Sequence, residues 1–147
     1  GGVTIDQAWE KKIQAYRSMC IPSFPNFFLM LGPNSPIGNY SVIYMAEVQT
    51  DYAIKVIKQW QANKLDTIEV KPQALEKWRA LLKAKMGKTV WASGCNSWYL
   101  DADGDPLTWP DKWKNWVVMM KDVDMGAFYQ KGEVLSESDH SKWDKVA

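Results

Sequence analysis

The chain has 147 residues, of which 46% are hydrophobic and 24% charged, a composition typical of a globular protein with a single core. Its formal net charge of +1 comes from acids and bases that are interspersed, so the sequence offers no electrostatic footprint for nucleic acid. No apolar run approaches the roughly 20 residues of a membrane span, and the first residues lack the basic and apolar regions of a signal peptide. We therefore expect a cytoplasmic protein with no membrane partner.

The first elements are a short helix and a buried strand. Thr4 and Gln7 have the spacing of a capping box, and they precede apolar residues at helical intervals from Ala8 onward. After two proline breaks, the continuous apolar run Phe27–Leu31 has the length and pattern of a strand covered on both faces. The turn Gly32-Pro33-Asn34 ends that strand.

A long helix is predicted from about Asn39 to Asn63. Its apolar residues spread around much of the helix circumference, which indicates burial on more than one side. We expect this helix to be the central element of the fold, packed on the Phe27–Leu31 strand.

The rest of the chain alternates short strands, helices and turns. The pattern predicts a short strand at 65–70, a helix from Pro72 to about Met86 stopped by Gly87, a hairpin or bent strand pair at 89–93 and 97–100, a turn at 101–106, and a helix at about 111–120. The predicted fold class is α+β, with residues 4–132 as one compact domain and residues 133–147 as a polar tail.

Two segments carry a family resemblance. Residues 23–41 read S-F-P-N-F-F-L-M-L-G-P-N-S-P-I-G-N-Y-S, and residues 91–104 read W-A-S-G-C-N-S-W-Y-L-D-A-D-G. From about Thr4 to Met119 the chain resembles the C-terminal part of flavin-dependent Baeyer–Villiger monooxygenases. The resemblance implies that Gly32, Pro33, Asn34 and Ser35 form the turn where backbone amides of the family meet the cofactor, with Asn39 where the family often has histidine. The alternative for this turn is a capped helix start.

The glycine motif that holds a dinucleotide does not occur in these residues. Binding of a dinucleotide pyrophosphate needs G-x-G-x-x-G between a strand and a helix, and the 147 residues contain no such motif. We therefore expect no cofactor, and a colourless protein that binds neither flavin nor nicotinamide tightly. In the resembling enzymes the long helix packs against a dinucleotide-binding sheet, so we expect its bared apolar face to be covered by a second copy in a homodimer.

Residues that usually carry acid–base, covalent or metal chemistry are sparse. Cys20 and Cys95 are far apart, without a C-x-x-C spacing, which favours two free thiols over zinc or a disulfide. His140, the single histidine, lies in the polar tail, so a catalytic triad is not expected. Alternating aspartates at 101–105 are similar to a calcium loop, but Lys112 stands where the loop requires glutamate, so a solvated turn is the better interpretation.

Nine tryptophans, six tyrosines and four phenylalanines give any pocket aromatic walls. We predict a pocket between the 32–44 segment and the 91–99 strand pair, where an apolar substrate would meet a few hydrogen-bond donors. The predicted catalytic residues are Asn34, Asn39, Tyr40 and Tyr99. The predicted substrate-binding residues are Phe28, Met30, Ser35, Tyr44, Trp91 and Trp98.

Three functional hypotheses follow. The first is a cofactor-independent enzyme derived from a monooxygenase tail, which holds a terpenoid or polyketide substrate and promotes a cyclisation or a pericyclic, Diels–Alder-type rearrangement by shape and hydrogen bonding. The second is the C-terminal portion of an FAD- and NADPH-dependent Baeyer–Villiger monooxygenase. The third is a non-catalytic binding module.

Overall fold

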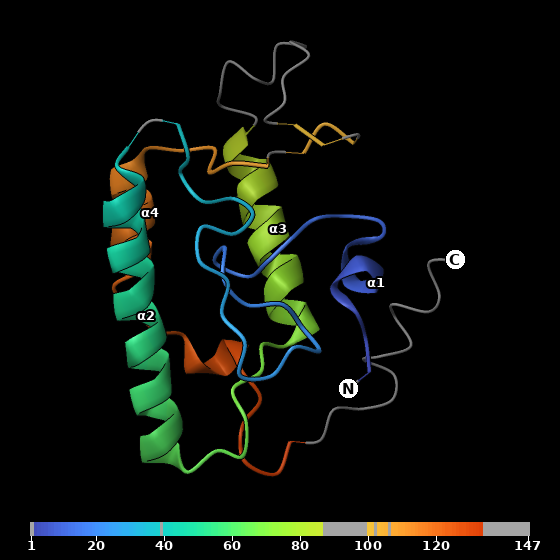
Figure 1. Ribbon diagram of the computed structural model, residues 1–147, viewed down its shortest axis with the longest axis vertical. Helices are drawn as coiled ribbons and strands as arrows, with labels where there is room; N and C mark the ends of the chain where they lie inside the picture. The colour runs from blue at the N-terminus through green and yellow to red at the C-terminus, as the bar shows by residue number, and fades with distance from the viewer. Residues whose placement is uncertain (1, 39, 87–99, 102, 106, 134–147) are drawn as a thin grey trace.

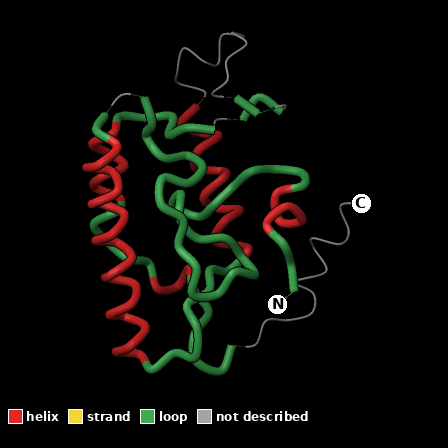
Figure 2. The backbone as a smooth tube through the Cα atoms, viewed as in Figure 1, coloured by secondary structure: helices red, strands yellow, loops and turns green. Residues whose placement is uncertain are grey.

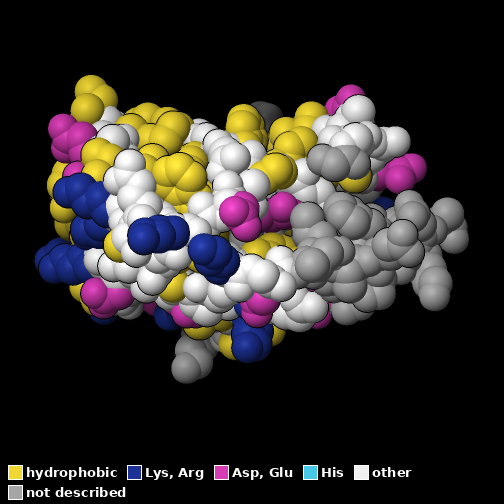
Figure 3. Space-filling model, turned by 90° about the horizontal axis from the view of Figure 1, so that it is seen from below, with side chains coloured by type: hydrophobic (Ala, Val, Ile, Leu, Met, Phe, Trp, Pro, Cys, Tyr) yellow, Lys and Arg dark blue, Asp and Glu magenta, His cyan; other side chains and the backbone are white. Residues whose placement is uncertain are grey.

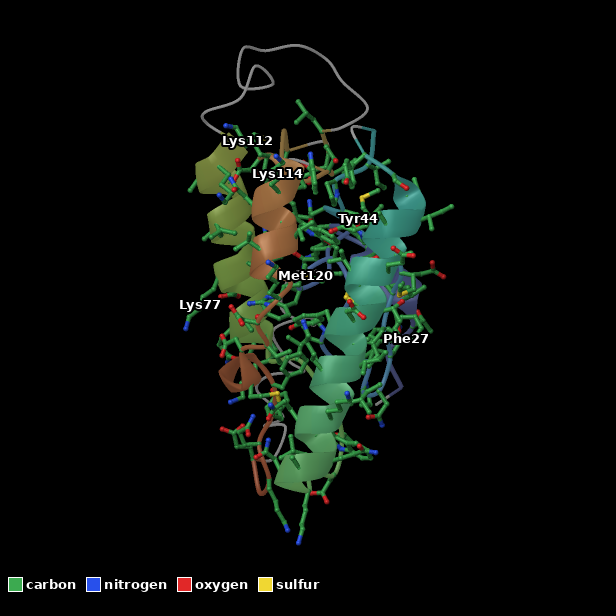
Figure 4. All side chains as sticks on the ribbon, turned by 90° about the vertical axis from the view of Figure 1, so that its left-hand side faces the viewer. Phe27, Tyr44, Lys77, Lys112, Lys114 and Met120 are labelled. Atoms are coloured by element: carbon green, nitrogen blue, oxygen red, sulfur yellow. The ribbon has the colours of Figure 1, made fainter. Side chains whose placement is uncertain are left out.

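The computed structural model describes residues 2–38, 40–86, 100–101, 103–105 and 107–133. In chain order the elements are α1 (Ile5–Trp9), α2 (Val42–Asn63), α3 (Pro72–Met86), α4 (Trp113–Met119) and the short 3-10 helix η2 (Met125–Ala127). The loops before α2 run through the space between α2 and α3, and α4 lies beside the first half of α2 (Figure 1; Figure 4). The predicted fold class of one small domain built around a long helix is confirmed.

The helix starts follow the capping signals in the sequence. Thr4 and Gln7 form the expected capping box at α1, although the helix ends at Trp9. The Ser41 side chain accepts the Tyr44 N–H and so caps α2, which ends at Asn63 and is followed by Lys64 with a left-handed φ of 50°. Both α2 and α3 match their predicted ranges closely, because their apolar residues recur at helical spacing over several turns.

The core lies between α2, α3, α4 and the loops they enclose. Its largest fully buried side chains include Tyr52 of α2, Trp116 of α4 and Phe128 after η2. Trp78 of α3 stacks on Trp109 with ring centroids 5.7 Å apart. Such aromatic pairs contribute about 0.5–1.5 kcal/mol beyond their buried area. A smaller cluster around Ala8, Ala15 and Ile21 holds the α1 region.

The predicted strand at Phe27–Leu31 is wrong. This run is loop (Figure 2), since the Leu29 N–H donates to the Met19 carbonyl and the Leu31 N–H donates to the Gln49 side chain instead of to a neighbouring strand. Leu31 also has a φ of 56°, which no strand residue adopts. The run is apolar because it covers α2 and a nearby loop, with Phe27 and Met30 left exposed.

Within the described ranges, extended backbone pairs only at isolated bridges. The predicted strand at 65–70 pairs at Val70, with Phe128, and another isolated bridge joins Tyr16 to Cys20. The predicted strand pair at 89–93 and 97–100 falls almost entirely outside the described residues, as does the tail from residue 134. Among the helices that are described, none is both long and apolar enough to cross a bilayer.

Candidate functional site

The 31–35 turn is fastened between α2 and the loop before α4. Gln49 is fully buried on α2, and its Oε1 accepts the Leu31 N–H at 2.7 Å while its Nε2 lies 3.5 Å from the Ser35 Oγ. The Ser35 carbonyl accepts the Thr108 hydroxyl at 3.0 Å and the Trp109 N–H at 3.2 Å. The turn therefore contacts both α2 and a loop segment 73 residues further along the chain than Ser35.

The amides of this turn face into the protein. The Asn34 N–H donates to the Leu107 carbonyl at 3.0 Å, and the Ser35 N–H donates to the Gly32 carbonyl at 3.2 Å. The helix starts only at Val42, behind a cap supplied by Ser41. The expectation that the Gly32–Ser35 turn opens the helix is therefore wrong, because the chain makes an extra loop before it enters α2.

Gly32 is required by a close approach of two backbones. A Cβ added at Gly32 would lie 2.4 Å from the Ser18 carbonyl oxygen, well inside the closest real contact. Positive φ values at Leu31 (56°) and Asn34 (67°) flank this position. Backbone strain of this kind costs about 1–3 kcal/mol per residue and is stable only where surrounding contacts hold it.

An aromatic cluster covers the start of α2. Tyr40 stacks on Trp113 of α4 with ring centroids 3.8 Å apart, and Tyr44 meets both rings edge-on. Figure 4 shows Tyr44 on the side of α2 that faces α4. The cluster is open to solvent, since Tyr40 is 37% exposed, and Val42 and Ile43 beside it are 48% and 75% exposed.

A line of apolar and small side chains continues along α2 on its solvent side. We call this line the outer stripe, and its members recur every three or four residues: Ile43, Ala46, Thr50, Ile54 and Ile57. Ile54 is 45% exposed and Ile57 is 37% exposed. Apolar side chains also remain visible at the end of the molecule where α2 terminates (Figure 3). An apolar face of this length favours contact with another protein surface.

The predicted site residues fall into separate groups. Asn34 and Ser35 are buried in the turn, Tyr40 and Tyr44 lie in the exposed aromatic cluster, and Phe28 packs against the core while Met30 is exposed. The other four (Asn39, Trp91, Trp98 and Tyr99) lie outside the described residues. Asn34 borders a cavity of about 20 Å³, and two larger cavities, of about 380 and 670 Å³, are lined by other residues.

Sequence reasoning missed Gln49 and Arg17. Gln49 follows Met45 by four residues and precedes Tyr52 by three, which places it on the buried face of the helix. A polar side chain on a buried face needs hydrogen-bond partners, and this was the available signal. The Arg17 guanidinium lies over the rings of Tyr16 and Tyr52 and donates to the carbonyls of Met119 and Asp122. No local pattern at Arg17 signals the contacts with Tyr52, Met119 and Asp122, because these residues lie from 35 to 105 positions further along the chain.

The acidic turn is organised by a lysine. The Lys12 ammonium pairs with Asp101 at 3.1 Å and with Asp105, while the Asp101 Oδ1 accepts the N–H groups of Asp103 and Asp105. Only Asp103 is well exposed, so a simple solvated turn is a wrong description. Partial burial would raise the pKa of Asp105, but the Lys12 ammonium outweighs it and lowers the pKa. In the described ranges, no group of three metal-ligating side chains occurs.

The described thiol is unreactive. Cys20 is a free thiol, as the sequence predicted, and it is buried. Burial raises the pKa of this thiol to about 12. A thiolate is the nucleophilic form, so this cysteine is a packing residue at neutral pH. Cys95 and His140 lie beyond the part of the chain that the structure describes.

Comparison with known proteins gives a consistent relationship. An uncharacterized monooxygenase of Mycobacterium tuberculosis is 45% identical over 109 residues, which are 74% of this chain and 22% of that protein. A Baeyer–Villiger monooxygenase of Streptomyces coelicolor is 36% identical over 112 residues, again 74% of this chain and 22% of that protein. No family model matches the chain.

The chain is related to the C-terminal portion of Baeyer–Villiger monooxygenases. The resemblance seen in the sequence is thereby confirmed. A steroid monooxygenase structure bound to NADP superposes with a TM-score of 0.76 at 24% identity, covering 90% of this chain and 26% of that one, and a cyclohexanone monooxygenase gives 0.72 at 25% identity. The chain therefore spans about a quarter of the length of the monooxygenases it matches.

The described residues do not by themselves fit a flavin dinucleotide. The N–H groups of Asn34 and Ser35 already donate to the carbonyls of Leu107 and Gly32, so they are not available to a cofactor. The sequence contains no G-x-G-x-x-G to cradle a pyrophosphate. We therefore derive no oxygen-transfer step from these side chains.

Proposed function

We propose that this chain acts as the C-terminal portion of a flavin-dependent Baeyer–Villiger-type monooxygenase, and that its outer stripe docks on the portion that holds FAD. FAD bound there would supply the oxygen activation. The chain would contribute a rigid wall made of α2, α4 and the fastened 31–35 turn.

The observation that carries the proposal is the combination of the sequence relationship with the bare outer stripe. The 109 residues that are 45% identical make up only about a fifth of the Mycobacterium tuberculosis relative. Along α2, Ile43, Ile54 and Ile57 are exposed on one line. An exposed apolar helix face of this kind is expected where a protein docks on a partner, here the proposed FAD-holding portion.

The cofactor-independent cyclase is the weaker hypothesis. It needs a cavity in which the predicted donors converge around an apolar substrate. Asn34 is 5% exposed within the turn, whereas Tyr40 stacks on Trp113 in the surface cluster. Tyr40 and Tyr44 contact each other, but this contact lies in the exposed cluster and not around a cavity. The non-catalytic binding module gains no specific support either.

Reconstitution tests the proposal. The full chain is co-expressed with the preceding portion of the Mycobacterium tuberculosis relative, and the pair is assayed for FAD content and for ketone-dependent NADPH oxidation. We expect the chain alone to be colourless and the pair to copurify as a yellow, active complex. Ile54→Asp should break the pair because it places a charge in the stripe, whereas Gln59→Asp, which adds the same charge at an exposed position of α2 outside the stripe, should leave it intact.

Two results would count against the proposal. One is stoichiometric flavin on the chain alone, because the docking portion would then not be the flavin holder. The other is a colourless chain that never pairs with the flavin-bearing portion but converts an apolar substrate by itself.

A further inference from the structure

A second cavity lies away from the outer stripe, beside α3. It has a volume of about 670 Å³ and is lined by residues of the 16–17 turn, α3, the end of α4 and η2. This volume is within the range of small-molecule sites, about 300–1,000 Å³. The cavity involves no residue of α2, so it is independent of the docking face.

Unneutralised cations line this cavity. Arg17, Lys71 and Lys77 line it together with a single carboxylate, Asp124. Lys71 pairs with Glu133 at 2.8 Å, but among the described residues no carboxylate lies within ion-pair distance of Arg17 or Lys77. The Asp124 Oδ1 accepts the Gly126 N–H and so is engaged in its own turn. The site therefore carries an excess of positive charge.

Arg17 is held in place before any ligand arrives. Its guanidinium lies 5.2 Å from the Tyr52 ring centroid and 5.6 Å from that of Tyr16, and it donates to the Met119 carbonyl at 3.0 Å. Arg17 and Ser18 have φ values of 49° and 65°, two successive left-handed residues that hold the turn at a cost in strain. A preorganised cation of this kind loses little entropy when it binds an anion.

An aromatic and apolar wall adjoins these cations. Trp78, Leu81 and Met119 line the same cavity, and Tyr16 meets Trp78 edge-on with centroids 6.3 Å apart. Trp78 is 5% exposed, and its indole N–H has no hydrogen-bond partner in the described structure.

We propose that this cavity binds a small organic carboxylate with an aryl or alkyl body, whose carboxylate is held by Arg17 and Lys77 and whose apolar part lies against Trp78 and Leu81. The proposal combines cations that have no carboxylate partner among the described residues with an apolar wall in the same cavity. It stands apart from the proposed docking function, because none of the residues that carry it belongs to the outer stripe.

Titration of the full 147-residue chain with 4-phenylbutyrate, followed by calorimetry and by the Trp78 indole N–H signal in NMR, tests the proposal. The neutral amide of the same acid is the matched ligand. We expect the acid to bind at least about tenfold more tightly than the amide, since one charge-assisted hydrogen bond is worth about a tenfold change in affinity.

Variants of residues that line the cavity test whether phenylbutyrate binds there. Lys77→Gln should weaken phenylbutyrate binding about tenfold, and Leu81→Glu should abolish it by adding a negative charge to the wall. Leu81 is 41% exposed, so this change should leave folding intact. Lys58→Gln removes the same charge from α2 and should have no effect. Equal binding of acid and amide, or unchanged affinity in both cavity variants, would overturn the proposal.

Discussion

At the scale of single residues, Gln49 is the side chain that fastens the family-like turn to α2. It is fully buried and bonds to Leu31 and Ser35. The helical pattern was predictable, but these partners were not, because both lie in a loop that the sequence pattern had assigned partly to a strand. A buried polar residue in an apolar stripe indicates that partners exist without indicating which ones.

Gln49→Leu should lower the free energy of unfolding by about 1–3 kcal/mol, because it leaves the partly buried Leu31 N–H without its acceptor. Urea titration followed by circular dichroism measures the change. Gln59→Leu is the matched control, since Gln59 is exposed on the same helix. Equal stability of the two variants would show that the Gln49 bonds do not hold the turn.

Gly32→Ala should also destabilise the fold, by roughly 1–3 kcal/mol, because the added methyl would lie 2.4 Å from the Ser18 carbonyl oxygen and force two backbones apart. The same urea titration measures this effect. A midpoint within error of the parent chain would mean that the 18 and 32 segments separate without cost.

At the scale of elements, α3 is tied to the segment before α4 by an ion pair. The Lys85 ammonium lies 2.5 Å from the Asp111 carboxylate. Partial burial would raise the pKa of Asp111, but hydrogen bonds from Lys85, Asn115 and the Lys112 amide outweigh it and lower the pKa to about 2. The sequence showed both helices but not this pairing, because it depends on how they pack.

Asp111→Asn should therefore change the acid dependence of stability. A carboxylate whose pKa is lower in the folded state than its ordinary 3.8 contributes stability that is fully present above pH 4 and is lost as the pH falls toward 2. The variant should be less stable than the parent at pH 6 and should lose less stability between pH 4 and pH 2. Urea midpoints at pH 6, pH 4 and pH 2 measure these differences, and Asp51→Asn, at an exposed position of α2, is the control. If the parent and Asp111→Asn lost the same stability as the pH falls, the assignment of the lowered pKa to Asp111 would be contradicted.

At the scale of the whole molecule, the outer stripe offers a self-complementary surface when the docking portion is missing. In an antiparallel pair of α2 helices centred near residue 52, the small Ala46 and Thr50 would face Ile57 and Ile54 of the partner. Glu47 and Lys58 lie on the same edge of the stripe, so each would meet its opposite charge across the two-fold axis. The predicted homodimer thus has a geometric basis and remains a prediction.

We expect the isolated chain to be dimeric at micromolar concentration by light scattering. Ile54→Asp should give monomers, Lys58→Glu should weaken the dimer by placing like charges opposite Glu47, and Glu47→Lys combined with Lys58→Glu should restore it. Addition of the flavin-bearing portion should replace the second copy. A soluble monomer of the parent chain at this concentration would show that the stripe needs no cover.

The sequence by itself determined the long helices, the capping box of α1 and the relationship to the monooxygenases, since these depend on spacing within short segments. Only the tertiary structure decided that Phe27–Leu31 is a loop, that the N–H groups of Asn34 and Ser35 donate to carbonyls of the protein, and that Arg17 meets Tyr52 and Met119. An apolar run has the same pattern whether it covers a helix or joins a sheet. Contacts across 70 to 100 residues depend on the packing of whole elements, which no local pattern encodes.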